Sequence, residues 1–505
     1  MPLSSFKLGS RLTLESFARA AGGDLKVVLT SAALRRVAAA RRVLERAMAS
    51  GKPVYGVNTG FGELASVMIS RERLAAVQRN LVLSHACGVG EPLAPCEARG
   101  ILFLRLNELS RGCSGVRLSL VRHLSRMLSD GIIPLIPSRG SVGASGDLAS
   151  QAHMALAAIG EGDVLYRGRR MPAANALKAA GLKPFVLAEK EGLALLNGTQ
   201  AMQSVGGFAL LTAERVWRAA NLACAASLDA LTGTPAPYAD AISRLKPHPG
   251  QAGAARALRR LLAGSEIRRS HAAGDPRVQD SYSLRCAPQV HGAVFDRLAE
   301  SRRVVEIEMR SVTDNPLVAG GRVISGGNFH GQALSFAFDS AAGALTTLAN
   351  ISERRAFQVT AGIAPRLKPF LARDPGVESG FMIAQYVAAA LASENKTLAH
   401  PASADSVPTS ANKEDFVSMG MWAALKFKKV VWNAAQVVAI ELVCAAQAIE
   451  FHRPLKSGRG VEEGLEVLRS RVKAARGDEV LSGKLETARE MVLSGAFDPI
   501  LDKRE

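Results

Sequence analysis

The C-terminal half of the chain carries the longest regular apolar pattern, which restricts the fold more than any other feature. From Val431 to Ile449, apolar side chains recur at alternating intervals of four and three residues, the spacing of one helical face. Small residues dominate this face, so neighbouring helices can pack closely. The sequence therefore predicts a mainly α-helical bundle. Similar patterns predict long helices over 195–232, 290–310, 330–360, 378–396 and 412–449.

The N-terminal part of the chain is less regular. It contains glycine-rich loops between short helical stretches, and residues 163–171 have the pattern of a small hairpin. We therefore expect a smaller, loop-rich α/β domain over residues 1–200 and a long-helix bundle domain over 201–505. The apolar stripes of the long helices are too extensive for one subunit to cover, which predicts an oligomer.

Charge and metal-ligand patterns limit the classes of function. The 505 residues include 63 lysines and arginines against 45 acidic residues, a formal net charge of +18. The basic residues occur as scattered pairs rather than runs, which favours a solvated positive surface over nucleic-acid binding. The six cysteines form no Cys-x-x-Cys pair and the nine histidines show no His-x-x-x-His spacing. Neither a disulfide framework nor a metal site is expected.

The sequence shows no pattern typical of a secreted or membrane protein. No apolar signal segment is expected at the N-terminus. The most apolar helix, around residues 430–449, is interrupted by polar side chains, so we do not expect it to span a bilayer. We therefore expect a cytoplasmic protein without a membrane partner.

Residues 140–148 contain the feature with the most distinctive chemical potential. Ala144, Ser145 and Gly146 are small, and Gly146 has no Cβ, so its backbone nitrogen can approach the carbonyl carbon of Ala144. Bond formation there, followed by loss of water from Ser145, would give a five-membered ring with an exocyclic methylidene electrophile. The apolar pattern after Asp147 predicts a helix, whose positive N-terminal end would withdraw electrons from that ring. The alternative is a structural turn of small residues.

A second glycine-rich loop spans residues 53–62 and has the sequence Pro-Val-Tyr-Gly-Val-Asn-Thr-Gly-Phe-Gly. Its three glycines and its asparagine are typical of a loop with several unusual backbone angles. No Gly-Lys-Ser/Thr follows, which excludes a phosphate-binding loop of the P-loop type.

Several motifs together resemble those of a known family. Tyr-Gly-Val-Asn-Thr-Gly-Phe-Gly, Gly-Ala-Ser-Gly-Asp-Leu, Asn-Gly-Thr-Gln, Tyr-Ser-Leu-Arg-Cys, Thr-Asp-Asn-Pro, Gly-Gly-Asn-Phe-His and Ser-Ala-Asn-Lys-Glu-Asp occur in this order. The chain resembles the aromatic amino-acid ammonia-lyases over nearly its whole length, and within them the histidine ammonia-lyases. The resemblance implies a mainly α-helical homotetramer whose active sites each combine several subunits. It also implies that Ala144, Ser145 and Gly146 cyclise autocatalytically into a methylidene-imidazolone (MIO), with no external cofactor and no metal.

The resemblance also implies roles for individual residues. Tyr55 matches the family's candidate base and Tyr282 its second catalytic tyrosine, while Arg285 would pair with the substrate carboxylate. The alternatives are a packed loop tyrosine at position 55 and loop hydrogen bonding for the polar residues. Asn197 and Gln289 match residues that hold the ring and the amino-acid end of the substrate. Phe329 matches a residue of the pocket wall.

The side-chain pocket is matched by His85, preceded by Ser84, and by Glu414. A carboxylate suits an imidazole N–H better than a phenyl ring. The histidine ammonia-lyase pattern therefore predicts deamination of L-histidine to trans-urocanate and ammonia, the first step of histidine degradation. The chain departs from that pattern at Lys413, Phe416, Ala287 and His291.

These departures leave alternatives open. The first is an ammonia-lyase of the same family that acts on tyrosine, phenylalanine or another amino acid. The second is an aminomutase that moves the amine to the β-carbon. A third, from another class, is a non-catalytic basic helical scaffold that binds anions, whose association would weaken steeply with salt.

Overall fold

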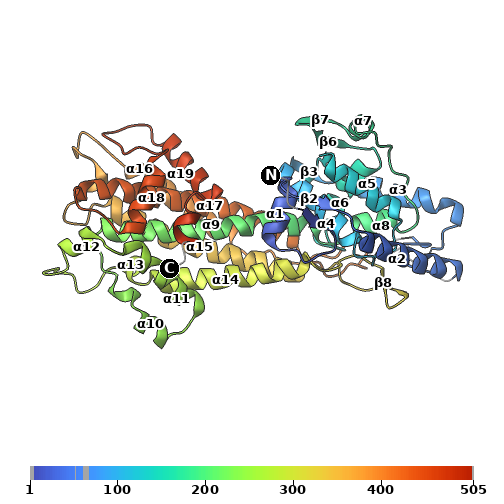
Figure 1. The fold of residues 1–505 in the computed structure, drawn as a ribbon, viewed down its shortest axis with the longest axis horizontal. Coiled ribbons are helices and arrows are strands. Elements are labelled where there is room, and N and C mark those ends of the chain that lie inside the picture. Colours follow the sequence, from blue (N-terminus) through green and yellow to red (C-terminus); the bar gives the residue numbers. More distant parts are fainter. Residues whose placement is uncertain (1–4, 52, 61–66, 503–505) are drawn as a thin grey trace. The chain divides into compact units, whose positions relative to one another are not determined.

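The computed structural model describes residues 5–51, 53–60 and 67–502. The chain divides into two compact units, coloured along the sequence in Figure 1. Unit 1 comprises Met1–Phe208, Arg302–Phe338 and Pro401–Leu425. Unit 2 comprises Ala209–Ser301, Asp339–His400 and Lys426–Glu505. Long helices dominate the described residues and the strands are short, so the predicted mainly α-helical fold is confirmed.

The described chain has four long helices, and four of the five unit boundaries fall within them. In unit 2, the Glu441 carboxylate of α17 accepts hydrogen bonds from Ser227 of α9 at 2.8 Å and from Ser352 of α15 at 2.6 Å. These three helices therefore lie side by side there (Figure 1). The four helices are α9 (Gln200–Ala230), α14 (Ala287–Glu308), α15 (Gln332–Thr360) and α17 (Gly420–Ile449).

Shorter helices complete unit 2. They are η3 (Ala236–Tyr238), α10 (Asp240–Leu245), α11 (Pro249–Leu262), α12 (Glu266–Ser270), α13 (Tyr282–Arg285), η4 (Pro369–Leu371), α16 (Met382–Leu398), η5 (Glu450–His452), α18 (Arg459–Arg469), α19 (Ser482–Ser494) and α20 (Asp498–Asp502).

Unit 1 combines helices with small sheets. Its largest sheet has three strands in the order β4-β6-β7, and its hairpin β6-β7 confirms the one predicted over 163–171. β1 pairs with β2 in parallel, and β3-β5 and β8-β9 are antiparallel pairs. The helices are α1 (Leu14–Gly22), α2 (Ser31–Ala49), η2 (Arg71–Arg73), α3 (Leu74–His85), α4 (Pro95–Leu109), α5 (Leu118–Ser129), α6 (Leu148–Ala158), α7 (Ala173–Ala179) and α8 (Glu191–Leu196). The strands are β1 (Ser5–Lys7), β2 (Lys26–Val28), β3 (Val89–Pro92), β4 (Ile133–Pro134), β5 (Pro137–Arg139), β6 (Asp163–Tyr166), β7 (Arg169–Pro172), β8 (Leu317–Ala319) and β9 (Arg322–Ile324).

The core of unit 1 is built around α4, which is buried on almost every side. Phe103 of α4 packs against Phe6 with ring centroids 5.5 Å apart and against Phe17 with centroids 6.4 Å apart. Burial of three aromatic rings in one cluster stabilises the unit by several kcal/mol relative to their exposure. This core supports the polar groups of the candidate site described below.

Two predicted helices begin later than the periodicity indicated. The helix expected over 412–449 begins only at Gly420, because Asn412 and Met419 have φ values of 68° and 52°. The helix expected from residue 195 is interrupted before α9, since Gly198 has a φ of 120°. Left-handed backbone of this kind cannot continue an α-helix. Both interruptions turn backbone and side chains toward the candidate site.

One helix in the described part of the chain has the length and composition of a membrane-spanning segment. It spans Gly420–His452, with a mean hydropathy of 1.5 over its most apolar window. Of that window, 89% is buried inside the protein, as in a core helix. Most residues of this window are therefore covered by packing within the protein.

Candidate active site

A cavity of about 520 Å³ lies in unit 1 and contains several of the residues singled out in the sequence. Its lining comes from the loop before α3, from α3 itself, from the start of α6, from α8 and from the loop before α17. The predicted site residues that line it are Tyr55, His85, Ser145, Asn197 and Glu414. Phe61 and Gly62 of the glycine-rich loop lie outside the described residues.

The Ala144-Ser145-Gly146 segment forms a tight turn immediately before α6. Ser145 has a φ of 51° and Gly146 a φ of 82°. Left-handed backbone is uncommon for serine and costs about 1 kcal/mol or more, so surrounding contacts must hold it in place. The turn lies at the N-terminal end of α6, as the sequence predicted, where the helix dipole is positive.

The segment around Gly198 holds this turn. Gly198 donates its N–H to the Ser145 carbonyl at 3.1 Å, and its own carbonyl accepts the N–H of Asp147 at 2.9 Å. The Gln151 side chain donates to the same Gly198 carbonyl at 3.0 Å. A Cβ atom placed on Gly146 would lie 2.1 Å from the Gly198 oxygen. Only glycine at position 146 permits this close approach of two backbone segments.

Asp147 fixes the turn from its other side. Its carboxylate accepts hydrogen bonds from the Met202 N–H and from the Ser141 hydroxyl, each at 2.8 Å. Asp147 is fully buried, and this burial raises the pKa of its carboxyl group to about 6. The turn is therefore tied to the start of α9.

A buried polar network lies beneath Asn197. Arg105 is 0% exposed and donates to the Asn197 carbonyl and to the Gln200 side chain. The Asn197 amide donates to the Asn315 carbonyl at 2.8 Å, and the buried Lys190 ammonium donates to that same oxygen at 2.8 Å. Buried cations in a hydrogen-bonded network restrict movement, because an unsatisfied partner would cost several kcal/mol. Asn197 is thereby fixed at the cavity wall.

Glu414 reaches the turn from the loop before α17. Its carboxylate accepts the Ser145 hydroxyl at 2.8 Å and the Thr409 hydroxyl at 2.9 Å. Backbone bonds in both directions between Thr409 and Glu414, at 2.9 and 3.3 Å, form an isolated antiparallel bridge. This bridge positions the carboxylate over the Ser145 side chain.

His85 ends α3 and lines the same cavity. The Ser84 hydroxyl lies 3.1 Å from His85 Nδ1 and donates its single proton to the Leu81 carbonyl at 3.2 Å. Toward His85 the hydroxyl therefore accepts, which places the ring proton on Nδ1 and leaves Nε2 as an acceptor. Burial lowers the pKa of His85 and outweighs the Leu81 backbone hydrogen bond and the Glu414 charge, which both raise it, so the neutral ring is favoured.

The remaining predicted site residues lie elsewhere. Tyr282, Arg285 and Gln289 belong to unit 2, on α13 and the start of α14, and Phe329 lies in the turn before α15 of unit 1. None of the four is among the residues that line the cavity. Arg285 Nε and Gln289 Oε1 are buried and have no hydrogen-bond partner among the described residues, which leaves capacity for a ligand.

The departures from the histidine ammonia-lyase pattern fall in different environments. Lys413 is exposed, and Phe416 is 62% exposed with its ring stacked on that of His330 at 6.0 Å. Ala287 and His291 are buried on α14, in unit 2. None of the four lines the cavity.

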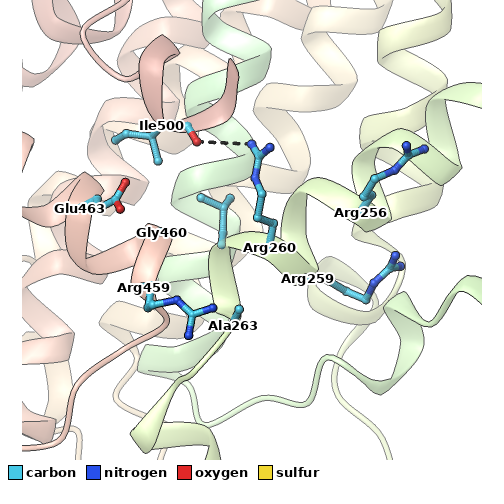
Figure 2. Close-up of a pocket in the computed structure, with 9 residues that line it drawn as sticks. Arg256, Arg259, Arg260, Ala263, Arg459, Gly460, Glu463 and Ile500 are labelled. Carbon is cyan, nitrogen blue, oxygen red and sulfur yellow. Dashed lines mark hydrogen bonds between the residues drawn. The ribbon is translucent and has the colours of Figure 1, made fainter. Parts of the chain in front are cut away.

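Two further cavities in the described part of the chain are lined by none of the predicted site residues. One, of about 420 Å³ in unit 2, is lined by arginines of α11 and α18, and its Arg260 donates to the Ile500 carbonyl at 3.3 Å (Figure 2). Another, of about 570 Å³, lies among α16, α17 and α19. Among the described residues, no group of three or more His, Cys, Asp or Glu side chains could hold a metal ion.

Sequence reasoning missed the residues that support the site. Gly198, Gln151, Arg105 and Thr409 each bond to a site residue or to its backbone neighbour. A buried arginine on an apolar helix was the one available signal, because Arg105 interrupts the run from Ile101 to Leu109.

Comparisons with known proteins show which chains and folds this protein is similar to. The family model described as "Aromatic amino acid lyase" matches residues 12–470. A histidine ammonia-lyase of Myxococcus xanthus is 49% identical over 489 residues, which is 96% of each chain. The crystal structure of histidine ammonia-lyase from Trypanosoma cruzi superimposes with a TM-score of 0.91 at 38% identity, covering 99% of this chain and 95% of the other.

A tyrosine aminomutase from Streptomyces globisporus has a similar fold, with a TM-score of 0.93 at 34% identity over 99% of each chain. Proteins of different catalytic outcome therefore share this architecture. The family model matches most of the chain, and a curated relative is 49% identical over 96% of its length. This chain therefore belongs to the aromatic amino acid lyase family.

Proposed function

We propose that the chain is a carbon–nitrogen lyase that deaminates L-histidine to trans-urocanate and ammonia. The observation that carries this proposal is the unit 1 cavity, where the Ser145 turn, the Glu414 carboxylate and the His85 ring meet. The near full-length similarity to the histidine ammonia-lyase of Myxococcus xanthus supports the choice of substrate.

Ala144, Ser145 and Gly146 fit the precursor of a methylidene-imidazolone. Gly146 has no Cβ and is held against Gly198, where any larger residue would collide with the backbone. Cyclisation and dehydration would release two water molecules, one from the new Ala144–Gly146 bond and one from Ser145. The methylidene group would supply an electron sink that makes the substrate amine a better leaving group. No external cofactor enters the proposal.

The cavity offers acceptors to the substrate side chain. Neutral His85 presents Nε2, and Glu414 presents a carboxylate, so both accept hydrogen bonds from ring N–H groups. The histidine ring supplies one such donor when neutral and two when protonated, whereas phenylalanine supplies none. A buried acceptor without a donor would cost about 1–3 kcal/mol, which disfavours phenylalanine.

The other residues bind and orient the amino-acid end of the substrate. Arg285 would pair with the carboxylate, and Tyr55 at the cavity wall would take the β-proton. Tyr282 would act as the second catalytic tyrosine. Gln289, Asn197 and Phe329 would complete the ring and substrate surroundings. We include in the proposal a cytoplasmic homotetramer whose active sites combine residues of several subunits, without nucleic-acid or membrane partners.

The alternative is a family member with the same electrophile that acts on tyrosine or phenylalanine, or shifts the amine as an aminomutase. The exposed apolar ring of Phe416, two positions after Glu414, favours this alternative. So does the similar fold of the tyrosine aminomutase.

An ultraviolet assay of the purified protein with histidine, tyrosine and phenylalanine in parallel, with ammonia measured alongside, tests the proposal. Urocanate and ammonia from histidine alone are the expected result. Activity on another amino acid without activity on histidine would replace the substrate but keep the electrophile. A β-amino acid without free ammonia would identify an aminomutase.

A further inference from the structure

Helix α13 carries two predicted site residues on a single turn. Tyr282 is 68% exposed, and the guanidinium carbon of Arg285 lies 4.5 Å from the centre of its ring. A helix of only four residues has almost no stability of its own. The orientation of these two side chains must therefore depend on contacts from outside α13.

The first outside contact comes from Gln358 of α15. Its Oε1 accepts the Ser281 hydroxyl at 2.9 Å, and its Nε2 donates to the Ser283 hydroxyl at 3.0 Å. A single side-chain amide thus bonds the residues immediately before and after Tyr282. The amide therefore ties both flanks of Tyr282 to α15.

The second contact comes from Arg355, three residues earlier on the same helix and therefore on the same face. Its Nη1 donates to the Ser283 carbonyl at 3.2 Å. The rest of this guanidinium is held by Glu441, with bonds of 2.5 Å from Nε and 2.9 Å from Nη2. Both residues are 0% exposed. The bidentate pair leaves the arginine no freedom to turn away from α13.

The His291 ring is a neutral neighbour of this arginine. Its Nε2 lies 3.3 Å from Arg355 Nη1, and its Nδ1 lies 3.1 Å from the Asn221 side-chain oxygen. Because arginine has only donors, Nε2 accepts and the ring proton lies on Nδ1. Burial, with a further contribution from Arg355, lowers the pKa of His291 well below its ordinary value. The neutral ring therefore adds no second positive charge.

A third contact reaches α13 from η3. The buried Tyr238 hydroxyl donates to the Leu284 carbonyl at 2.8 Å. The Tyr238 backbone carbonyl in turn accepts a hydrogen bond from Arg259 of α11, an arginine drawn in Figure 2. Two consecutive carbonyls of α13 are thus bonded from different elements of unit 2.

We propose that Gln358 and Arg355 are positioning residues, which hold α13 so that Arg285 is presented to the substrate carboxylate. The role of Arg285 rests on the proposed function, whereas the restraint on α13 rests only on the contacts above. Gln358 and Arg355 would therefore influence binding of the carboxylate and leave recognition of the imidazole unchanged.

Amide hydrogen exchange of residues 281–286 in the full-length protein tests the restraint without reference to activity. Gln358→Leu removes both side-chain bonds at a half-buried site and should accelerate this exchange by about tenfold, as expected for two lost hydrogen bonds. Gln358→Glu keeps the acceptor for Ser281 and should have a smaller effect. The control is Arg354→Gln, on the same helix, whose bond goes to Glu353 instead of α13. Unchanged exchange in Gln358→Leu would overturn the restraint.

Binding and kinetics test the role. In Gln358→Leu, the KM for histidine and the Ki for urocanate should rise by about tenfold, while the Ki for imidazole, which has no carboxylate, should stay constant. In an Arg285→Gln background, Gln358→Leu should add little, because the two changes act through one group. Equal weakening of urocanate and imidazole, or full additivity with Arg285→Gln, would overturn the positioning role. A wild-type protein inactive on every amino acid would refute the proposed function, and the exchange experiment would still decide the restraint.

Discussion

The Ser145 hydroxyl donates a hydrogen bond to the Glu414 carboxylate at 2.8 Å, although 269 positions separate the two residues in the chain. This bond joins the turn before α6 to the loop before α17 and brings the electrophile precursor against an anionic side chain. The loop geometry is essential, because Glu414 would lie on a continuous helix if α17 began where the apolar pattern first suggested. The contact places both groups at one cavity, and the predictions below test the role of each.

Replacing the Ser145 hydroxyl tests the electrophile. Ser145→Ala should abolish turnover while the fold remains intact, because the side chain then has no hydroxyl to lose as water. Mass spectrometry of the wild-type protein should show a deficit equal to two water molecules, and the second of these should be absent in the variant. Ser129→Ala, at an exposed position at the end of α5, is the matched control. Near-normal activity of Ser145→Ala would refute the ring.

Neutralising Glu414 tests recognition of the side chain. Glu414→Gln should lower kcat/KM for histidine by about tenfold or more, since a hydrogen bond to a charged group is worth about 1.5–3 kcal/mol. Any activity on tyrosine or phenylalanine should fall less, because neither presents an imidazole N–H. Parallel steady-state assays measure the ratio. Equal losses on all substrates would remove Glu414 from imidazole recognition.

Ser84 should determine which nitrogen of His85 carries the proton. Ser84→Ala removes one of two acceptors for the His85 ring, the other being the Leu81 carbonyl, and so weakens the preference for a proton on Nδ1. A net loss of about 1 kcal/mol predicts a KM for histidine that is roughly fivefold higher. Nitrogen-15 chemical shifts of the His85 ring report the tautomer directly. Ser84→Thr keeps the hydroxyl and should behave like wild type; a wild-type spectrum for Ser84→Ala would contradict this assignment.

His291 should make the folded protein sensitive to acid. Its pKa is lowered in the folded state, so below the ordinary value of 6.5 the unfolded chain takes up a proton that the folded chain does not. Its contribution to the free energy of unfolding is therefore lost as pH falls below 6.5, by up to about 1.4 kcal/mol per pH unit. His291→Met removes the titrating group and places an apolar side chain beside Arg355 and Asn221. The loss of stability at low pH that His291 causes should then disappear. Urea unfolding at several pH values measures the slope, and parallel slopes for both proteins would contradict the prediction.

The long helices were predictable because their signal is local. The pattern from Val431 to Ile449 repeats with the period of an α-helix, and burial of one face requires no knowledge of the partner. The hairpin β6-β7 was predictable for the same reason, since its strands are neighbours in sequence. The ends of the helices were less predictable: Met419 has left-handed backbone and bonds through its N–H to the distant Val142 carbonyl, and Gly198 also has a positive φ.

The site residues divide along a similar line. Ser145, Gly146 and His85 could be identified from their immediate neighbours in the sequence, and the structure places Ser145 and His85 at one cavity. The supporting residues could not be identified this way. Arg105 bonds to Asn197 across 92 positions of the chain. Thr409 has no distinctive sequence context, and only its hydrogen bond to Glu414 identifies it as a supporting residue. The roles of Tyr282, Arg285 and Gln289 stay predictions.

The sequence by itself determined the helical bundle, the candidate Ala144-Ser145-Gly146 triplet and the family resemblance, because each depends on residue type and short-range spacing. Tertiary structure alone decided that Glu414 faces Ser145, that Arg105 bonds to Asn197, and that Arg355 and Gln358 bond to the segment of α13. The physical reason is that hydrogen bonds and burial act between groups close in space. The partner of a buried charge is the group that helix packing brings close to it, and a local sequence pattern does not identify that group.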